Sequence, residues 1–322
     1  MNRIISIVKR MVYLFRLKRI NSFFRNEFKG KQHPIIISGS PRGGTTWLYE
    51  VLQASTNSFG LWEPLHPKTI QEYYPNTNQW FHKYIPPSED VVTINKFIAD
   101  VCQGDFITES MLQKNIHFKD YKSTEQLLVK FCRLNALLPW FVNHFKNYKV
   151  IQIYRNPLAV VASQMKHGAW NYKEKYNGFE LTGHEYYPEY YEQYKNILSE
   201  VRYPEEQLAV IWALDVIPAF AAQSERVLHL KYEELFLYPE ENFNKIFNFL
   251  NIKAPGHLNE LIQKPSSTTK QGSNILTEPK LQLETWKKNL TEEQANRVKN
   301  ILLKFGFMQI DDVDYSLEIQ RS

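Results

Sequence analysis

Short apolar runs alternate along the chain with longer segments in which apolar residues recur every three to four positions. The short runs are rich in β-branched residues and bounded by turn residues, which is typical of buried strands in a parallel sheet. They lie at residues 35–37, 127–130, 150–154 and 227–231. The segments with helical spacing lie at 45–52, 158–165, 205–222, 239–250 and 292–305. This alternation predicts a single α/β domain with a mostly parallel sheet and helices on both faces.

The first of these strands runs into a glycine-rich turn. Residues 34–48 read PIIISGSPRGGTTWL, and helical spacing begins directly after the glycines. Glycine lets the backbone turn back with its N–H groups pointing inward, and the positive end of the helix dipole lies at the same point. A strand, a glycine loop and a helix N-terminus in this order predict a binding site for an anion.

The basic residue of this loop narrows the kind of anion. A Walker A loop has a lysine directly after its second glycine, where it meets the β- and γ-phosphates of a nucleotide. Gly39 and Gly44 have the Walker A spacing, but Thr45 stands where the lysine belongs, and the cation is Arg42. We therefore expect a 5′-phosphate that binds Arg42, Thr45, Thr46 and backbone amides. The alternatives are a glycine turn without a ligand and a divergent kinase, which would need a lysine at position 45 and a magnesium-holding carboxylate.

The loop resembles that of a known family. Pro41-Arg42-Gly43-Gly44-Thr45-Thr46-Trp47 is similar to the 5′-phosphosulfate loop of sulfotransferases, which use 3′-phosphoadenosine-5′-phosphosulfate (PAPS), and further similarities follow through residues 34–310. The resemblance implies a P-loop NTPase-like fold, PAPS as co-substrate, 3′,5′-ADP as product and no metal. It assigns PAPS binding in this loop to Arg42, Gly43, Gly44, Thr45, Thr46 and Trp47.

A second similarity to the sulfotransferases follows the strand at 150–154. Arg155 comes directly after this strand, Asn156 suits the cap of the next helix, and Ser163 lies two turns along it. Arg155 with Ser163 resembles the 3′-phosphate site of the family. The planar fork of arginine suits a dianionic phosphate, and the serine hydroxyl adds a donor. His167 stands where tyrosylprotein sulfotransferases have another arginine.

The resemblance assigns two further segments to the nucleotide. Tyr232 begins Tyr-Glu-Glu-Leu after the strand at 227–231, which is similar to the adenine-side motif whose tyrosine contacts the base. The polar loop at 265–274 stands where sulfotransferases close a loop over the 3′-phosphate, and Ser267 and Lys270 are its candidates. A surface loop without a ligand is the alternative interpretation of its composition.

The candidate catalytic base is Glu63, in the segment Trp62-Glu63-Pro64-Leu65-His66. Because proline disfavours the α region for the residue before it, we expect Glu63 in extended backbone. Its spacing from Arg42 resembles that of tyrosylprotein sulfotransferases, in which a glutamate is the base. The Glu-Pro-Leu sequence itself is closer to that of carbohydrate sulfotransferases. His66 is the reserve candidate, and an exposed loop glutamate is the alternative.

Lys130 is the candidate that neutralises charge on the transferring sulfuryl group. Its spacing before Arg155 is similar to that of a lysine with this role in tyrosylprotein sulfotransferases. The chain departs from their Lys-Asp-Pro by reading Lys130-Phe131-Cys132-Arg133. Arg133 is therefore an alternative for the role, and a solvated lysine at a strand end is the other interpretation.

The implied reaction is in-line transfer of the sulfuryl group to an acceptor hydroxyl. Glu63 would remove the acceptor proton, while Arg42 and Lys130 would stabilise the developing charge. We expect irregular, aromatic-rich inserts at about 64–125 and 168–206 to bind the acceptor. The acceptor predicted is a saccharide, or a glycolipid if the N-terminal segment contacts membrane. The alternative is a non-catalytic module that binds a PAPS-type nucleotide.

The N-terminal segment, residues 1–30, is basic and apolar. Its longest apolar run, Met11 to Phe15, is too short to cross a bilayer. Ile4, Val8, Met11 and Phe15 would share one face of a helix, so we expect an amphipathic helix whose residues 1–25 lie on an anionic membrane surface. Packing on its own domain or on a partner is the alternative. The segment has no cleavage site of the signal-peptide kind.

Composition indicates the kind of partner and the cellular compartment. A net charge of +5 and a pI near 8.9 suit an anionic ligand without requiring nucleic acid. Two cysteines imply no disulfide framework and favour a reducing compartment. We therefore expect a cytoplasmic enzyme, on the inner face of the membrane if the N-terminal segment binds there. The chain would consist of this basic segment at 1–30, a sulfotransferase domain at 31–310 and a tail at 311–322.

Overall fold

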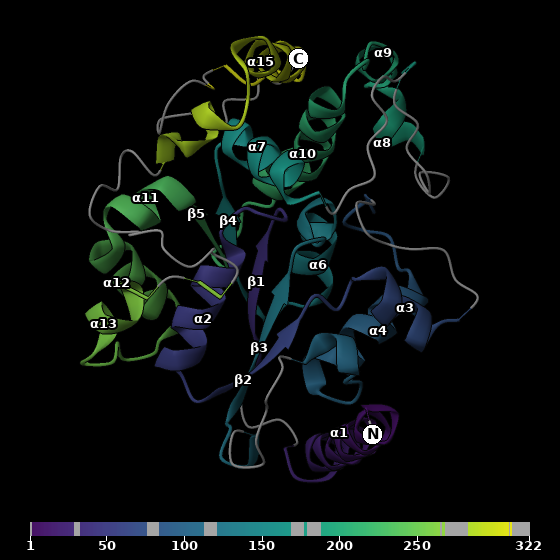
Figure 1. Ribbon diagram of the computed structural model, residues 1–322, viewed down its shortest axis with the longest axis vertical. Helices are drawn as coiled ribbons and strands as arrows, with labels where there is room; N and C mark the ends of the chain where they lie inside the picture. The colour runs from purple at the N-terminus through teal and green to yellow at the C-terminus, as the bar shows by residue number, and fades with distance from the viewer. Residues whose placement is uncertain are drawn as a thin grey trace.

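A computed structural model describes residues 2–28, 33–75, 84–112, 121–168, 177–178, 188–264, 266–267, 283–308 and 310. In this part of the chain, five strands form one parallel sheet in the order β2-β3-β1-β4-β5 (Figure 1). The strands are β1 (Ile35–Gly39), β2 (Ser58–Trp62), β3 (Gln126–Phe131), β4 (Lys149–Tyr154) and β5 (Val227–Lys231). The predicted α/β fold with a parallel sheet is confirmed.

Strand β2 was not among the predicted strands. Its central residue, Gly60, is a poor strand former, and the structure shows why glycine is there. A Cβ on Gly60 would lie 1.6 Å from the hydroxyl oxygen of Tyr49. The strand pairs with β3 so that Trp62 is opposite Lys130, which brings the residue after Trp62 beside the end of β3.

Helices cover both faces of the sheet, as predicted (Figure 1). One face packs against α2 (Thr45–Ser55), α11 (Tyr232–Leu237), α12 (Pro239–Leu250) and α13 (Leu258–Ile262). The other face carries α4 (Val92–Gln103), α6 (Leu138–His144), α7 (Pro157–His167) and α10 (Pro204–Ala221), and α15 (Glu292–Lys304) packs on α10 and α7 in the same apolar cluster. The remaining short elements are α3 (Pro67–Tyr73), η1 (Glu109–Met111), η2 (Asn135–Leu137), α8 (Pro188–Glu192), α9 (Lys195–Ser199) and η4 (Glu284–Lys288).

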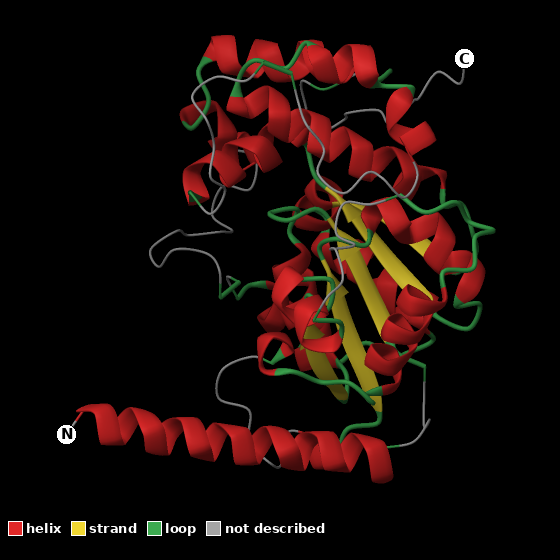
Figure 2. Cartoon of the chain, turned by 90° about the vertical axis from the view of Figure 1, so that its right-hand side faces the viewer, coloured by secondary structure: helices red, strands yellow, loops and turns green. Residues whose placement is uncertain are grey.

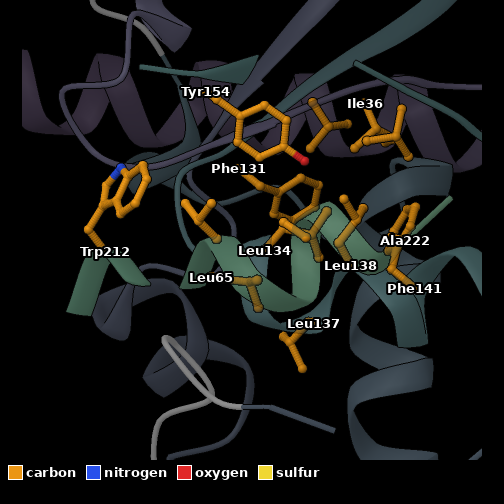
Figure 3. Packing of buried hydrophobic residues seen from close by; sticks show 14 of the residues in the cluster. Ile36, Leu65, Phe131, Leu134, Leu137, Leu138, Phe141, Tyr154, Trp212 and Ala222 are labelled. Carbon is orange, nitrogen blue, oxygen red and sulfur yellow. The ribbon is translucent and has the colours of Figure 1, made fainter. Parts of the chain in front are cut away.

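The sheet separates two apolar clusters because successive side chains of a strand point to opposite faces. In β1, Ile36 joins one cluster, while Ile35 and Ile37 join the other. Figure 3 shows part of the first cluster, in which the strand residues Ile36, Phe131 and Tyr154 are drawn with residues that follow β3, among them Leu134, Leu137 and Leu138. These two cores hold the strand ends in fixed positions.

The stretch at 64–125 differs from the irregular region that the sequence predicted. It contains α3 and α4, and α4 buries Ile94, Phe97, Ile98 and Val101 at helical spacing. This spacing covers one short helix between aromatic-rich segments, so it was not apparent against its surroundings. Acceptor binding by this stretch, and by 168–206, stays a prediction. Residues 169–176 and 179–187 and the tail at 311–322 lie outside the described residues.

The N-terminal segment forms one helix, α1 (Asn2–Asn26). Its last turns pack on the domain through the buried residues Ile20, Phe23 and Phe24, while large apolar residues nearer its start are exposed. Figure 2 shows α1 along the end of the sheet where the strands begin. The C-terminal half of α1 therefore packs on its own domain, and contact of the N-terminal half with a membrane stays a prediction. No helix in the described ranges is long and apolar enough to cross a membrane.

Candidate active site

The candidate residues come together at one edge of the sheet. In a parallel sheet all carboxyl ends lie at the same edge, which is where open α/β sheets bind ligands. The loop at 40–44 follows β1, and Glu63 follows β2. Lys130 lies at the end of β3, Arg155 follows β4, and Tyr232 follows β5. Five strand ends therefore contribute to one site.

The glycine loop is tightly constrained. Arg42 has φ 70° and Gly44 has φ 91°, both in the left-handed region, which a non-glycine residue such as arginine adopts only at a cost. The N–H of Gly43 donates to the carbonyl of Ser40 at 2.8 Å. A Cβ on Gly44 would lie 2.2 Å from the ring of Tyr232. Glycine at this position therefore lets the loop and the Tyr232 ring pack directly against each other.

Helix α2 begins at Thr45, directly after the loop. The Thr45 hydroxyl lies 3.3 Å from the Cys132 sulfur and is buried. The Trp47 indole is buried as well and donates to the carbonyl of Ile262 at 3.3 Å. Since these two side chains face the core, the first-turn backbone amides and Thr46 are the groups of α2 placed to meet an anion.

Glu63 lies in a cationic, hydrogen-bonded setting. Its Oε1 is 3.0 Å from the Lys130 Nζ, and its Oε2 is 3.5 Å from the Arg133 Nη1. The backbone N–H of Cys132 donates to Oε2 at 2.9 Å. The Lys130 Nζ also donates to the Thr46 hydroxyl at 3.4 Å. A carboxylate and a lysine therefore meet beside the first turn of α2.

Electrostatics keep this pair ionised. Burial would raise the pKa of the Glu63 carboxyl, but the charges of Lys130 and Arg133 and the Cys132 N–H outweigh it, so the pKa lies below its usual value. Burial would lower the pKa of Lys130, but the charge and the hydrogen bond of the Glu63 carboxylate raise it instead. The pKa of the Cys132 thiol itself is raised to about 12, chiefly by burial. The thiol therefore stays neutral, and Glu63 is the counter-ion of Lys130.

Two expectations about these residues are corrected. Glu63 is not in extended backbone but has φ 47°. Its N–H donates to the Lys130 carbonyl at 2.8 Å, and its carbonyl accepts from the N–H of His66 at 2.9 Å. These bonds override the local preference of a residue before proline and aim the side chain at β3. Lys130 is not a solvated lysine, since its side chain is 3 % exposed and lies 3.9 Å from the Trp62 ring centroid. Arg133 contacts Glu63 as well, and its sharing or taking the role of Lys130 stays a prediction.

A second cationic group lies at the end of β4. The Arg155 Nη1 donates to the carbonyl of Arg42 at 2.9 Å, and its guanidinium carbon is 4.5 Å from the Tyr232 ring centroid. The Nε of Arg42 donates to the Ser163 hydroxyl at 3.0 Å. Burial and the charge of Arg155 lower the pKa of Arg42. The Nε of Arg155 is buried without a hydrogen-bond partner among the described residues. A dianion would supply both the missing acceptor and the missing negative charge.

The strand-end turn after β4 depends on a residue that the sequence interpretation missed. Oε1 of Glu233 accepts from the N–H of Asn156 at 2.9 Å. Asn156 caps α7, as predicted, by accepting from the N–H groups of Leu158 and Ala159. Glu233 therefore holds the backbone directly after Arg155. The signal available in the sequence was a glutamate directly after Tyr232.

The remaining candidates are two residues of the polar loop, Ser267 and Lys270, and two histidines. Ser267 lies against α2, where its N–H donates to the Glu50 carboxylate at 3.1 Å and its hydroxyl donates to the same group. Lys270 lies outside the described residues. His66 caps α3 through Nδ1, which accepts from the N–H of Lys68 at 3.3 Å, and burial and the charge of Arg133 lower the pKa of its imidazole. His167 is the exposed last residue of α7.

Comparison with protein families identifies the class. The model of the sulfotransferase domain family matches residues 32–304. The chain therefore belongs to the sulfotransferases, and sulfuryl transfer is its reaction class. A comparison with curated proteins found no match.

Several solved structures similar to this chain are sulfotransferases as well. The sulfotransferase domain of the Synechococcus PCC 7002 olefin synthase is 15% identical, with a TM-score of 0.45, and the match covers 88% of this chain and 98% of that one. Mouse sulfotransferase SULT7A1, complexed with PAP, is 14% identical with a TM-score of 0.42, covering 88% of each chain. Sulfotransferase STF9 from Mycobacterium avium is 10% identical with a TM-score of 0.44, covering 91% and 83%.

Proposed function

We propose that this chain transfers a sulfuryl group from PAPS to an acceptor hydroxyl. One observation carries the proposal. The Glu63–Lys130 pair and the cluster of Arg42 and Arg155 both adjoin the loop before α2. A donor lying across this loop would have its sulfuryl group beside the pair and its nucleotide beside the cluster. General-base chemistry and anion binding are thus available within one site.

The donor would be held mainly by fixed donors and cations. The loop amides and Thr46 are positioned for the 5′-phosphosulfate, and Arg155 and Ser163 for the 3′-phosphate. The guanidinium of Arg42 lies with Ser163 rather than with Lys130, which supports a donor-holding role for it. Tyr232, which lies against Gly44 and Arg155, would contact the adenine, as the family motif implies. The buried unpaired Nε of Arg155 fits a phosphate oxygen.

In the reaction step, the acceptor oxygen attacks sulfur in line with the bond to the 5′-phosphate. A new oxygen–sulfur bond forms, the sulfur–oxygen bond to the phosphate breaks, and 3′,5′-ADP leaves. Glu63 takes the acceptor proton. Lys130 and the first-turn amides of α2 offset the charge that develops on the bridging oxygen and the sulfuryl oxygens.

Lys130 links donor binding to the strength of the base. In the resting enzyme its Nζ is 3.0 Å from Glu63 and 3.4 Å from Thr46. A sulfuryl group at the loop attracts Lys130, which weakens the interaction that keeps the pKa of Glu63 low. The pKa of Glu63 then rises, and the carboxylate becomes a stronger base when the donor is bound.

The acceptor class that we propose is a saccharide hydroxyl. The tripeptide Glu63-Pro64-Leu65, which contains the proposed base, supports it, because this sequence is closer to that of carbohydrate sulfotransferases. A screen with radiolabelled PAPS and soluble mono- and oligosaccharides would test it, with tyrosine peptides as the comparison. Sulfation of the peptides and of no saccharide would exclude the saccharide assignment without affecting the donor assignment.

Calorimetric titration tests the donor site. We expect 3′,5′-ADP to bind more tightly than 5′-AMP or magnesium ATP, and Arg155→Ala to weaken 3′,5′-ADP by about 10- to 100-fold, as for losing one or more charge-assisted hydrogen bonds. Binding of 5′-AMP should be nearly unchanged in this variant, because it lacks the 3′-phosphate. Tighter binding of magnesium ATP would overturn the proposal in favour of a divergent kinase.

A further inference from the structure

Helix α1 exposes a band of large apolar side chains. Met11 and Phe15 are 65% and 63% exposed, and Ile7, Val12 and Leu14 are exposed beside them. Exposed apolar residues occur singly on most protein surfaces, whereas five within nine residues of one helix form a patch. The patch lies on the half of α1 that precedes its buried anchors.

The opposite face of α1 is the one that contacts the domain. The Tyr13 hydroxyl donates to the carbonyl of Glu109 at 3.5 Å, and the Asn21 amide donates to the carbonyl of Ile107 at 3.0 Å. Arg10 forms an ion pair with Glu109. At 3.6 residues per turn, Met11 and Phe15 lie about 160° around the helix from Tyr13 and about 80–140° from Arg10 and Asn21. The apolar band therefore points away from the domain.

The band is surrounded by positive charge. Helix α1 contains seven of the 39 Lys and Arg residues of the chain and none of its 34 Asp and Glu residues. Arg16, Lys18 and Arg19 are exposed next to the band, and the Arg19 guanidinium carbon lies 6.0 Å from the Phe15 ring centroid. An apolar face with a basic border and no acidic residue is complementary to an anionic lipid surface.

We propose that α1 docks the protein on an anionic lipid bilayer. Met11 and Phe15 enter the boundary between headgroups and acyl chains, while Arg16 and Lys18 lie among the anionic headgroups. The helix lies on the surface rather than crossing it, in keeping with its charged residues. A second copy of the chain is a poor occupant, because pairing two such helices would bring two sets of seven like charges together.

Docking through this face sets the orientation of the enzyme. Phe24 of α1 packs on Phe59 at the start of β2, with ring centroids 4.9 Å apart, so α1 lies where the strands begin. The candidate active site lies at the opposite edge, where they end. With α1 on the bilayer, the site faces the aqueous phase. Acceptors in solution can reach it, whereas a glycolipid headgroup in the same bilayer is on the wrong side of the domain.

Vesicle cosedimentation of the full chain tests the docking. We expect binding to phosphatidylcholine vesicles that contain phosphatidylglycerol and little binding to phosphatidylcholine alone. Met11→Ser with Phe15→Ser should weaken binding roughly tenfold or more, because two large apolar side chains no longer insert. Arg16→Gln with Lys18→Gln should weaken binding to the anionic vesicles, by about fivefold per charge, and reduce its salt dependence.

The matched control is Leu303→Ser with Met308→Ser, which removes two similarly exposed residues, each 53% exposed, away from α1. It should leave vesicle binding unchanged, and thermal unfolding of each variant reports whether the fold is kept. Equal losses in the control would overturn the proposal, as would a protein that binds no vesicles. In the latter case, a dimer in light scattering that Met11→Ser with Phe15→Ser makes monomeric would assign the face to self-association. The outcomes do not depend on PAPS binding.

Discussion

Two carboxylates at the same edge of the sheet, Glu63 and Glu233, have pKa values that are shifted in opposite directions. Glu63 has Lys130 and Arg133 within 3.5 Å, and the pKa of its carboxyl is lowered in spite of burial. Glu233 accepts one backbone hydrogen bond from Asn156, and its Oε2 has no partner among the described residues. Burial raises the pKa of Glu233, although the Asn156 N–H and the charge of Arg155 act against the shift.

The difference teaches that neighbours, rather than burial, decide what a carboxylate at a strand end can do. When cations lie at hydrogen-bond distance from a carboxylate, a bound anion can attract these cations and raise the pKa of the carboxylate. Such a carboxylate suits the role of a base. A carboxylate held by a backbone N–H is a support for the turn that carries Arg155. The same substitution by glutamine should therefore have different consequences at the two positions.

The largest contrast is expected in catalysis. Glu63→Gln keeps an acceptor for the Cys132 N–H but cannot take the acceptor proton, so kcat should fall by about 10²- to 10⁴-fold. Affinity for 3′,5′-ADP should be retained. The matched variant Glu233→Gln keeps the oxygen that Asn156 needs, and its kcat should stay close to that of the wild type. Unchanged turnover in Glu63→Gln would remove Glu63 as the base.

The next contrast is in stability. Glu63→Gln leaves the Lys130 ammonium buried without its counter-ion, which should lower the free energy of unfolding by about 3–5 kcal/mol. The double variant Glu63→Gln with Lys130→Met should regain most of this loss, because no unpaired charge stays buried. Urea denaturation measures both. Losses that simply add in the double variant would contradict a coupled pair.

The pH dependence of stability should have opposite signs at the two carboxylates. Because the folded pKa of Glu63 is lowered, its contribution is present at neutral pH and is lost as the pH falls through that pKa. The folded pKa of Glu233 is raised, so its contribution declines as the pH rises from the unfolded pKa of about 4.3 through the folded pKa.

Urea midpoints test these signs in the two glutamine variants, from about pH 4 upward for Glu233 and from about pH 5 downward for Glu63, whose folded pKa lies below its unfolded value. Relative to the wild type, Glu233→Gln should gain stability as the pH rises, and Glu63→Gln should gain stability as the pH falls. Each difference changes by at most about 1.4 kcal/mol per pH unit for one proton. Two slopes of the same sign would contradict the contrast between the carboxylates.

The smallest effect is expected on the nucleotide side. Ser163→Ala removes one neutral hydroxyl, so the affinity for 3′,5′-ADP should fall by about 2- to 10-fold, as for one ordinary hydrogen bond. The affinity for 5′-AMP should not change, and kcat at saturating donor should stay near that of the wild type. A loss of kcat larger than the loss of affinity would place Ser163 on the base side instead.

Local signals predicted much of this structure. The strand, glycine loop and helix at 34–48 are contiguous, so their order alone indicated an anion site, and the helix cap at Asn156 follows from the residues next to it. Four of the five strands were evident as apolar runs. These features depend on interactions between residues that are close in sequence.

The rest depended on contacts between distant segments. Strand β2 was not apparent in the sequence because its centre is a glycine, Gly60. Glycine is needed there because Tyr49 of α2 fills the space that a side chain would take. The conformation of Glu63 follows from its bond to the Lys130 carbonyl on the neighbouring strand. The burial of Lys130 follows from Trp62 and Glu63 packing over it. Packing of α2 on the sheet set the first, and the register of β2 on β3 set the other two. No local pattern in the chain specifies either.

The placement of the basic residues on α1 also changes the meaning of the net charge. The chain carries +5 overall, yet seven of its basic residues lie on α1, so the rest of the chain has more acidic than basic residues. A strand of five residues is about 16 Å long, so α1 and the active site are separated by more than the screening length of about 8 Å at physiological ionic strength. Attraction of an anionic donor therefore depends on the cations at the strand ends. Added salt should act on donor binding and on α1 as two independent effects.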